Sequence, residues 1–337
     1  MNPVSEILRD GDVLARFARP VPGGGYRYEA PWPEVLKLLS EIGGRDLSTA
    51  RLLEGHLNSL QLVALYGHAV QQARVLQAVQ AGTLLGVWGA DAADPLRFNE
   101  EAIQPRRLIG AKRYASGAGT VGLAIVPVDE GGALHLLLLD TKDANRVDLS
   151  SWDHRGMRAT ASGIYDFTGL EVEADEVLGQ PDDYRREPFF VGGIWRCAAA
   201  QLGAIEAIVA GMTRDLFGSG RDAHPLQMAR IGEAIREART ARLWVEDAAR
   251  QVETCAPDGQ KSDVDRIVAL SAYARLATEA AAMRVIDLAE RAIGLGSFAI
   301  GHPVEALTRD LAVYIRQANP DAVLLGHGRV LARDLLT

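Results

Sequence analysis

The C-terminal part of the chain places a lone carboxylate where a catalytic base could stand. Asp321 follows Pro320 in YIRQANPDAVLLGHGRVLAR, residues 314–333, and the apolar residues after it are spaced like a helix. A carboxylate in a dry pocket serves as a general base because burial raises its pKa. Aspartate is also favoured in the first turn of a helix, where it stabilises free N–H groups. The residues themselves leave both roles open for Asp321.

Three histidines are secondary candidates for moving a proton. They are His302 and His327 in the same region, and His154, which lies beside Trp152 and Arg155. Each is an isolated histidine, so a structural role is the first interpretation of all three. We expect no metal site.

The elements that must position these residues change in character along the chain. Residues 1–82 carry apolar residues at helical spacing, with breaks at glycine pairs. Residues 83–182 contain short β-favoured runs bounded by Gly, Pro and Asp, which is typical of strands. Residues 183–337 return to long amphipathic stretches. We therefore predict a short helical domain, a middle β domain and a C-terminal helical bundle.

The predicted bundle rests on three long stretches of helical spacing. They cover roughly residues 189–217, 225–255 and 261–293, and two shorter helices are expected after Pro303 and after Pro320. Long amphipathic helices of this kind pack as antiparallel neighbours.

Composition excludes several classes of function. The chain has 337 residues and a net charge of -8, which gives no electrostatic support for nucleic-acid binding. No uninterrupted apolar run reaches the ~18 residues of a membrane span, and MNPVSEILRDGD lacks the pattern of a signal peptide. The two cysteines, Cys197 and Cys255, suggest no disulfide scaffold. We expect a cytoplasmic protein.

Three motifs occur in an order that is similar to a known family. RRLIGAKRYASGAGTVGLAIVPV (residues 106–128) contains G-x-K-x-aromatic-x-Ser, and WDHRGMRATASGIYDFTGLEVEADEVLG (residues 152–179) contains G-x-R-x-Thr. AERAIGLGSFAIGHPVEALTRDLAVY (residues 289–314) has a Gly-rich turn followed by Pro-x-Glu and Arg-Asp. Together they resemble the acyl-CoA dehydrogenase family, of which this chain looks like a divergent and short member.

The resemblance implies an α+β chain with an N-terminal helical domain, a middle β-barrel or sandwich and a C-terminal four-helix bundle. It also implies an FAD site at a subunit interface, and hence a homodimer or homotetramer. The substrate would be an acyl thioester or another small molecule, and an electron acceptor would be needed.

The resemblance assigns flavin contacts to two parts of the chain. In the β domain, Tyr114 would pack against the flavin ring and Ser116 would donate a hydrogen bond to its polar edge. Val87 and Trp88 would lie in the loop beside the pyrimidine part of the flavin. Trp88 stands where the family has threonine, so it either closes the pocket or packs in the core. In the helical domain the implied phosphate and adenine contacts are Arg214 or Arg221, Gln227, Arg291, Gly294 and Gly296, with arginine suited to phosphate.

The family's base does not map onto a glutamate here. Counting forward from Arg309-Asp310 places it on Ala318, and counting back from the end of the last helix places it on Asp321. An alternative family position lies beside an arginine that matches Arg196, whose neighbour here is Trp195. Asp321, with Arg196, is therefore the predicted catalytic set.

Three functions compete at this stage. The first is α,β-dehydrogenation of an acyl thioester, with hydride transfer to flavin N5. The second is a flavin monooxygenase of the same fold, which the missing glutamate favours. The third is a non-catalytic member that binds a ligand or partner. Function must be argued from the site and not from the fold.

Overall fold

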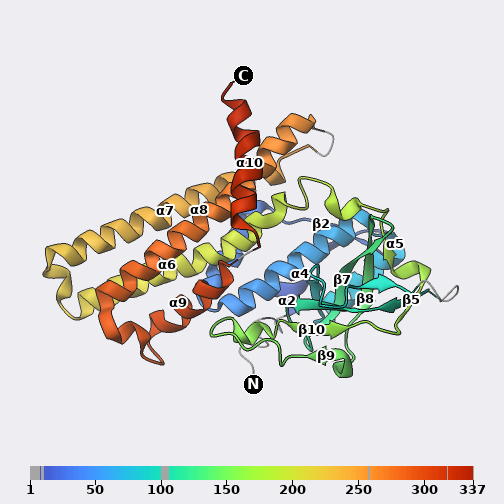
Figure 1. Ribbon diagram of the computed structural model, residues 1–337, viewed down its shortest axis with the longest axis horizontal. Coiled ribbons are helices and arrows are strands. Elements are labelled where there is room, and N and C mark those ends of the chain that lie inside the picture. Colours follow the sequence, from blue (N-terminus) through green and yellow to red (C-terminus); the bar gives the residue numbers. More distant parts are fainter. Residues whose placement is uncertain (1–7, 9–10, 100–105, 257–258, 317, 337) are drawn as a thin grey trace. The chain divides into compact units, whose positions relative to one another are not determined.

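The computed structural model describes residues 8, 11–99, 106–256, 259–316 and 318–336 (Figure 1). Long helices occur together with short strands, which confirms the predicted α+β class. The α-helices are α2 (Gly11–Ala15), α3 (Trp32–Gly43), α4 (Leu47–Tyr66), α5 (Ala69–Gln80), α6 (Trp195–Gly218), α7 (Pro225–Glu253), α8 (Lys261–Ile293), α9 (Pro303–Tyr314) and α10 (Pro320–Asp334).

The strands are short except in one hairpin. They are β1 (Ala18–Pro20), β2 (Tyr26–Tyr28), β3 (Leu84–Val87), β4 (Arg97–Phe98), β5 (Arg106–Ile109), β6 (Ala111–Ala115), β7 (Val121–Glu130), β8 (Ala133–Asp140), β9 (Val147–Asp148), β10 (Gly163–Asp166), β11 (Glu171–Val172) and β12 (Val177–Leu178).

The chain forms two compact units. Unit 1 comprises Met1–Ala30, Arg51–Asp153 and Arg158–Arg186, and unit 2 comprises Pro31–Ala50, His154–Met157 and Glu187–Thr337. Helix α4 begins in unit 2 and continues in unit 1. The limits of the three predicted domains, at residues 82 and 182, stay a prediction.

Unit 2 is built around a group of long helices. Helices α6, α7 and α8 pack against one another and lie side by side in Figure 1, while α6 also contacts α3 and α9. The predicted helices at 225–255 and 261–293 are confirmed. Helix α6 begins at Trp195, later than predicted, because residues Gly192–Ile194 form a tighter 3-10 turn.

The helix ends of unit 2 follow local sequence signals. Helix α7 begins at Pro225, and the His224 ring accepts a hydrogen bond from the Leu226 N–H at 3.2 Å. Helix α8 ends before Gly294, whose φ of 81° is costly for residues with a side chain. The shorter helices α9 and α10 begin at Pro303 and Pro320, as predicted.

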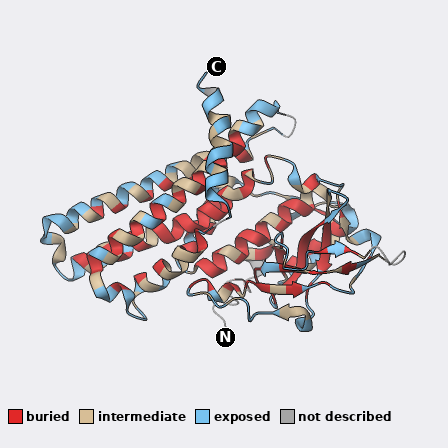
Figure 2. Cartoon of the chain, in the orientation of Figure 1, coloured by how far each residue is buried: buried red, intermediate tan, exposed pale blue. Residues whose placement is uncertain are grey.

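Two glycines allow α3 and α6 to touch through their backbones. A Cβ on Gly43 would lie 2.1 Å from the Ala200 carbonyl oxygen, and a Cβ on Gly203 would lie 1.9 Å from the Ser40 carbonyl oxygen. No side chain fits at either position, so this helix crossing requires both glycines. Figure 2 shows buried residues along the length of α6, consistent with its place at the centre of unit 2.

The main sheet of unit 1 has the strand order β12-β8-β7-β3. Strand β7 pairs antiparallel with β8 and parallel with β3. Residues 121–128 of β7 are all buried, although successive side chains point to opposite faces of the sheet. Both faces are therefore covered, which explains the continuous apolar sequence VGLAIVPV.

Smaller sheets complete unit 1. Strands β6, β10 and β9 form one sheet and β11, β5 and β4 form another. Strand β6 pairs antiparallel with β10, and the register shifts between Gly163 and Tyr165. The loops that leave β3 and β6 meet at this edge, and they carry the residues for which the sequence predicts flavin contacts.

A buried histidine joins three segments of unit 1. His56 on α4 is fully buried, its Nε2 donates to the Leu14 carbonyl oxygen at 2.8 Å, and its Nδ1 accepts from the Leu85 N–H at 3.2 Å. The backbone N–H of Leu85 requires a lone pair on Nδ1, so the ring is neutral. Burial lowers the pKa of His56 to about 4.

One segment of the described chain is long and apolar enough to cross a membrane. It is Gly192–Gly218, with a mean hydropathy of 1.2, and 78% of the tested window is buried inside the protein. This segment forms α6, and a buried core helix meets the same criterion.

Candidate functional site

A buried lysine holds the loop after β3 against β6. The Lys112 Nζ lies 2.6 Å from Asp91 Oδ1 and 3.5 Å from the Gly89 carbonyl oxygen, and the lysine side chain is 2% exposed. Burial lowers the pKa of Lys112, and Asp91 opposes this shift. A backbone hydrogen bond from the Arg113 N–H to the Ala90 carbonyl oxygen, at 2.9 Å, reinforces the contact. The lysine of the G-x-K motif therefore fixes the shape of the candidate flavin loop.

Trp88 packs inside the sheet. Its indole N–H donates to the Ser116 carbonyl oxygen at 3.0 Å, and its ring lies 5.4 Å from Tyr165 and 6.4 Å from Phe167. The side chain is buried, and its backbone N–H donates to the Ile125 carbonyl oxygen. These contacts favour the packing role for Trp88 over a role in closing the pocket.

The residues that flank Trp88 differ in exposure. Val87 is half-buried at the end of β3, whereas Gly89 and Ala90 are exposed. Within the described residues, the N–H groups of Gly89 and Ala90 donate to no other backbone group. These two amides are therefore the donors that the loop can offer to a ligand.

Tyr114 presents an open aromatic surface at the end of β6. The residue is 52% exposed, the Arg113 guanidinium lies 5.0 Å from its ring centroid, and the Trp152 ring lies 6.3 Å away at a steep angle. Its φ of 52° lies in the left-handed region, which is uncommon for a bulky residue. Such backbone strain concentrates at functional positions.

A chain of hydroxyl groups continues from Ser116. Ser162 Oγ donates to Ser116 Oγ at 3.0 Å, and the Thr160 and Ser162 hydroxyls lie 2.8 Å apart. All three residues are buried. Ser116 accepts this bond, so its own hydroxyl hydrogen is available for a ligand at the loop.

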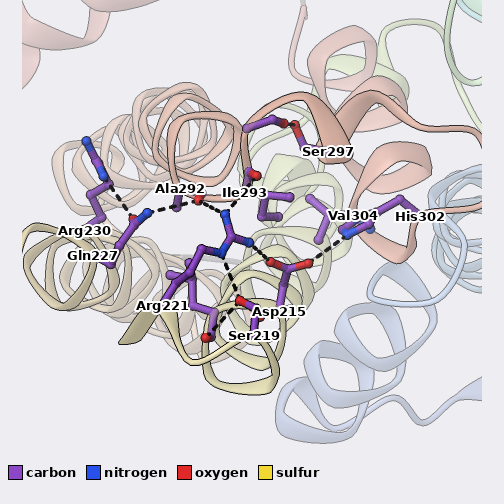
Figure 3. A network of polar contacts seen from close by, with 12 residues as sticks. Asp215, Ser219, Arg221, Gln227, Arg230, Ala292, Ile293, Ser297, His302 and Val304 are labelled. Atoms are coloured by element: carbon purple, nitrogen blue, oxygen red, sulfur yellow. Dashed lines mark hydrogen bonds and ion pairs between the residues drawn. The ribbon is translucent and has the colours of Figure 1, made fainter. Parts of the chain in front are cut away.

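Arg221 belongs to a polar network at the end of the helices of unit 2 (Figure 3). Its Nη1 donates to the carbonyl oxygens of Ala292 at 3.1 Å and Ile293 at 3.2 Å, its Nε donates to Ser219, and its Nη2 pairs with Asp215. A cation on the last carbonyls of α8 stabilises the helix end. A single N–H of Nη2 remains without a described partner, so Arg221 acts first as a cap.

Gln227 also serves the end of α8. Its Nε2 donates to the Ala292 carbonyl oxygen at 3.2 Å, and its Oε1 accepts from Arg230 at 3.0 Å (Figure 3). Both ends of this amide are engaged within the chain.

Asp215 connects Arg221 to His302. The His302 Nδ1 accepts from the Val304 N–H at 3.2 Å, so the ring proton lies on Nε2, 3.4 Å from Asp215 Oδ2. The network thereby joins the end of α6 and the end of α8 to the start of α9 (Figure 3). His302 thus caps a helix, and these contacts give it a structural role.

Two other predicted arginines are more accessible than Arg221. Arg214 is exposed and forms no ion pair with a described residue, and the Arg291 side chain is 67% exposed with its Nε on Asp287 at 2.6 Å. Gly294 has open space where a Cβ would lie, and Leu295 beside it is 88% exposed. At Gly296 a Cβ would meet only Ile293, at 3.6 Å.

The segment around the start of α10 presents no buried acid. Asp321 is exposed in the first turn of α10, and Ala318 is also exposed. The Ala318 carbonyl oxygen accepts from Arg275 Nη2 at 3.1 Å, and Arg275 is 6% exposed. A buried cation on α8 therefore holds this loop. Burial lowers the pKa of His327, which lies further along α10.

Arg196 is enclosed at the start of α6. Its side chain is 2% exposed, its Nη2 lies 2.7 Å from Glu253 Oε1, and its guanidinium stacks 4.9 Å from the centroid of Trp195. The Trp195 indole N–H donates to the same carboxylate oxygen at 3.0 Å. His154 lies half-buried in a short segment of unit 2. No cluster of His, Cys, Asp and Glu in the described residues is arranged to hold a metal ion.

Comparison with known proteins relates this geometry to solved structures. FMN-bound TdsC from Paenibacillus sp. A11-2 superposes with a TM-score of 0.84 at 19% identity, covering 98% of this chain and 90% of TdsC. Butyryl-CoA dehydrogenase from Megasphaera elsdenii superposes with a TM-score of 0.80 at 18% identity, covering 98% and 89%. The chain has the acyl-CoA dehydrogenase fold.

Sequence similarity to curated proteins is more limited. A dibenzothiophene monooxygenase from Rhodococcus erythropolis is 26% identical over 194 residues, covering 53% of this chain and 45% of the relative. The chain thus spans about half the length of the curated relatives it matches. No family model matches the sequence.

On the acyl-CoA dehydrogenase fold, the predicted residues separate into two groups. Unit 1 brings Trp88, Tyr114 and Ser116 together at one edge, and unit 2 brings Arg221 and Gln227 together at the end of α8. The sequence does not indicate the roles of Ser162 and Thr160, since only the tertiary fold aligns these hydroxyls with Ser116. Their assignment as cofactor contacts stays a prediction.

Proposed function

We propose that this protein is a flavin-dependent monooxygenase acting on a small organic substrate. The observation that carries the proposal is the segment before α10, where the resemblance predicts the base of a thioester dehydrogenase. Between Tyr314 and Asp334 the sequence contains one acidic residue, Asp321. It is exposed in the first turn of α10. An exposed carboxylate lacks the dry pocket that a base toward a carbon acid requires.

The comparisons support the same function. The curated relatives are dibenzothiophene monooxygenases, and TdsC, which shares the fold, is also described as one. In this reaction one oxygen atom of O₂ enters the substrate and the other leaves as water. The two further electrons come from reduced flavin, so a separate reductase must supply it.

The residues of unit 1 fit a flavin ring. The exposed face of Tyr114 offers a flat apolar wall, and the Ser116 hydroxyl with the Gly89 and Ala90 amides offers donors to a polar edge. Bound flavin would supply the redox chemistry, while these residues orient the ring. Lys112 holds the loop in place through its ion pair with Asp91.

The residues of unit 2 fit a phosphate group in part. Arg214 and Arg291 are exposed, and an arginine pairs bidentately with phosphate. Arg221 and Gln227 already bind the end of α8, so we assign them to holding that helix end. The sequence predicts FAD, whereas TdsC was solved with FMN. Chromatography of the cofactor released from purified protein distinguishes the two.

Dehydrogenation of an acyl thioester is the second candidate. It is favoured by the fold shared with butyryl-CoA dehydrogenase and by Asp321, which occupies one of the two expected positions of the base and lies three residues after the other, Ala318. This reaction requires that Asp321 become enclosed when substrate binds.

We also propose that the protein is a homo-oligomer. Unit 2 exposes large apolar side chains along α7 and at the turn after α8, and such surfaces usually mark an interface. They include Met228, Ile235, Leu243, Leu295, Phe298 and Ile300. Sedimentation at micromolar concentration should show a dimer or tetramer, and a flavin-bound monomer would contradict this expectation.

Two assays on one preparation test the proposed function. Flavin-loaded protein is first mixed without oxygen with a panel of acyl-CoA thioesters, and the visible flavin band is followed. The protein is then given photoreduced flavin, oxygen and a sulfur or nitrogen heterocycle, and oxygenated product is measured by mass spectrometry with ¹⁸O₂. We expect label in the product and no bleaching by thioesters. Bleaching by a thioester would establish the dehydrogenase instead.

A further inference from the structure

One buried cation of unit 2 lacks a counter-ion. The buried lysine and arginine residues of the described chain are Lys112, Arg196 and Arg275. Lys112 lies 2.6 Å from a carboxylate oxygen of Asp91. Arg196 lies 2.7 Å from a carboxylate oxygen of Glu253. Arg275 on α8 is 6% exposed, and it forms no ion pair with any described carboxylate. Arg275 is therefore the exception among these cations.

Such a position is unfavourable for an arginine. A buried charge loses its hydration, and without a partner nothing offsets that loss. Arginine cannot avoid the cost by releasing its proton. Burial lowers the pKa of Arg275, which is the direction expected for a cation without a close anion. An anion bound from outside the chain would offset this cost.

The nearest acid along α8 is already paired. Glu279 follows Arg275 by four residues, so both lie on the same face of the helix. Glu279 Oε1 accepts from Arg316 Nη1 at 3.1 Å, and the Glu279 side chain is 12% exposed. This carboxylate therefore neutralises Arg316.

Most N–H groups of Arg275 have no described partner. An arginine carries five N–H donors. Nη2 donates to the Ala318 carbonyl oxygen at 3.1 Å, and Nε is buried without a hydrogen-bond partner. One donor is used, so four of the five remain among the described residues. A planar guanidinium binds both oxygens of a carboxylate with a pair of such donors.

Holding the turn between α9 and α10 does not by itself require this guanidinium. Gln201 on α6 is 1% exposed, and its Nε2 donates to the Tyr314 carbonyl oxygen at 3.1 Å. The Arg316–Glu279 pair holds the same turn from α8. Ala318, which Arg275 contacts, is exposed, so a ligand beside the turn lies close to the guanidinium.

We propose that Arg275 binds the carboxylate of a small organic ligand beside the turn between α9 and α10. Ala318 is one of the two positions at which the resemblance predicts the catalytic base, and here a cation contacts it. In this assignment the negative charge at that position belongs to the substrate. The identity of the ligand as the substrate rests on the proposed function, but the affinity of Arg275 for a carboxylate does not.

Calorimetry with three probes tests this site. Benzoate carries a carboxylate on a flat ring, benzamide is its neutral analogue, and inorganic phosphate is an anion without an organic body. Each is titrated into the full chain, with and without flavin. We expect benzoate to bind at least about tenfold more tightly than benzamide. We expect it to bind more tightly than phosphate as well, because a dianion costs more to bury.

Two variants of the arginine and one control accompany the titrations. Arg275→Gln keeps a donor for the Ala318 carbonyl oxygen but removes the charge, so it should weaken benzoate at least about tenfold and leave benzamide unchanged. Arg275→Lys keeps the charge without the planar fork and should weaken benzoate about threefold. Arg329→Gln removes an equal charge from an exposed residue of α10 and should have no effect. If Arg275→Gln does not fold, Arg275→Lys decides the question.

The outcomes separate this inference from the proposed function. Equal affinity for benzoate and benzamide, no measurable benzoate binding, or unchanged benzoate affinity in the Arg275 variants would overturn the site even in a protein that binds flavin. Tighter binding of phosphate than of benzoate would indicate a site for an inorganic anion and would also overturn it. Benzoate binding that depends on Arg275 in a protein that takes up no flavin would support the site and reject the monooxygenase.

Discussion

Acid should destabilise unit 1 through a single histidine. His56 is fully buried and neutral, with a pKa of about 4 in the folded protein against 6.5 in the unfolded chain. Between these values the unfolded state binds more protons, so the free energy of unfolding falls as pH decreases. From this difference the loss is about 2 kcal/mol at pH 5, and it approaches ~3 kcal/mol below pH 4. The full contribution is present above pH 6.5.

The structural reason is that protonation breaks a specific contact. A proton on Nδ1 would meet the Leu85 N–H, which donates to that nitrogen at 3.2 Å. Leu85 belongs to β3, which leads into the loop at Trp88. Acid should therefore loosen the same strand that positions the candidate flavin loop.

Urea unfolding of wild type and His56→Gln between pH 5 and pH 7 measures this effect. Glutamine cannot titrate, so we expect the variant to be less stable at pH 7 but to lose about 2 kcal/mol less on acidification. His68→Gln, which replaces an exposed histidine of the same unit, controls for the loss of one imidazole. If wild type and His56→Gln show the same dependence on pH, His56 is not responsible and the reasoning is wrong.

Three further predictions concern packing, the loop and the base. Gly203→Ala should lower the free energy of unfolding by about 1–3 kcal/mol, because its Cβ would meet the Ser40 carbonyl oxygen. Gly232→Ala is the control, since open space surrounds Gly232, and it should be neutral or stabilising. Thermal melts measure both variants. Lys112→Met should weaken flavin binding about tenfold by releasing the loop at Asp91, and an unchanged dissociation constant in a fluorescence titration would contradict this role. Asp321→Asn should leave oxygenated product within about twofold of wild type, whereas dehydrogenation through this acid would fall by orders of magnitude.

The helices could be predicted from the sequence because the residues that start and end a helix act within one turn of it. Pro225, Pro303 and Pro320 start helices where the missing N–H is harmless, and Gly294 ends α8 where a positive φ is needed. Helix α6 begins at Trp195, later than the predicted start at residue 189. Apolar periodicity continues through residues 189–194, and it does not distinguish a 3-10 turn from an α-helix.

The predicted site was only partly open to this reasoning. Tyr114 and Ser116 could be named from the spacing of the G-x-K motif. The sequence did not show that Arg214 is exposed whereas Arg221 binds the end of α8. Both arginines lie near the end of α6 in sequence, yet Arg214 is exposed and Arg221 caps α8. Which arginine remains accessible depends on where the end of α8 lies, more than 70 residues later in the chain.

The sequence by itself determined the α+β class, the helix ends and the β-rich middle region, because propensity, capping and alternation act over a few residues. Only the tertiary structure decided which polar groups meet. It placed Lys112 on Asp91 and Ser162 on Ser116. The physical reason is that a buried polar group must find a partner wherever the fold provides one, and separation along the chain places no limit on that choice.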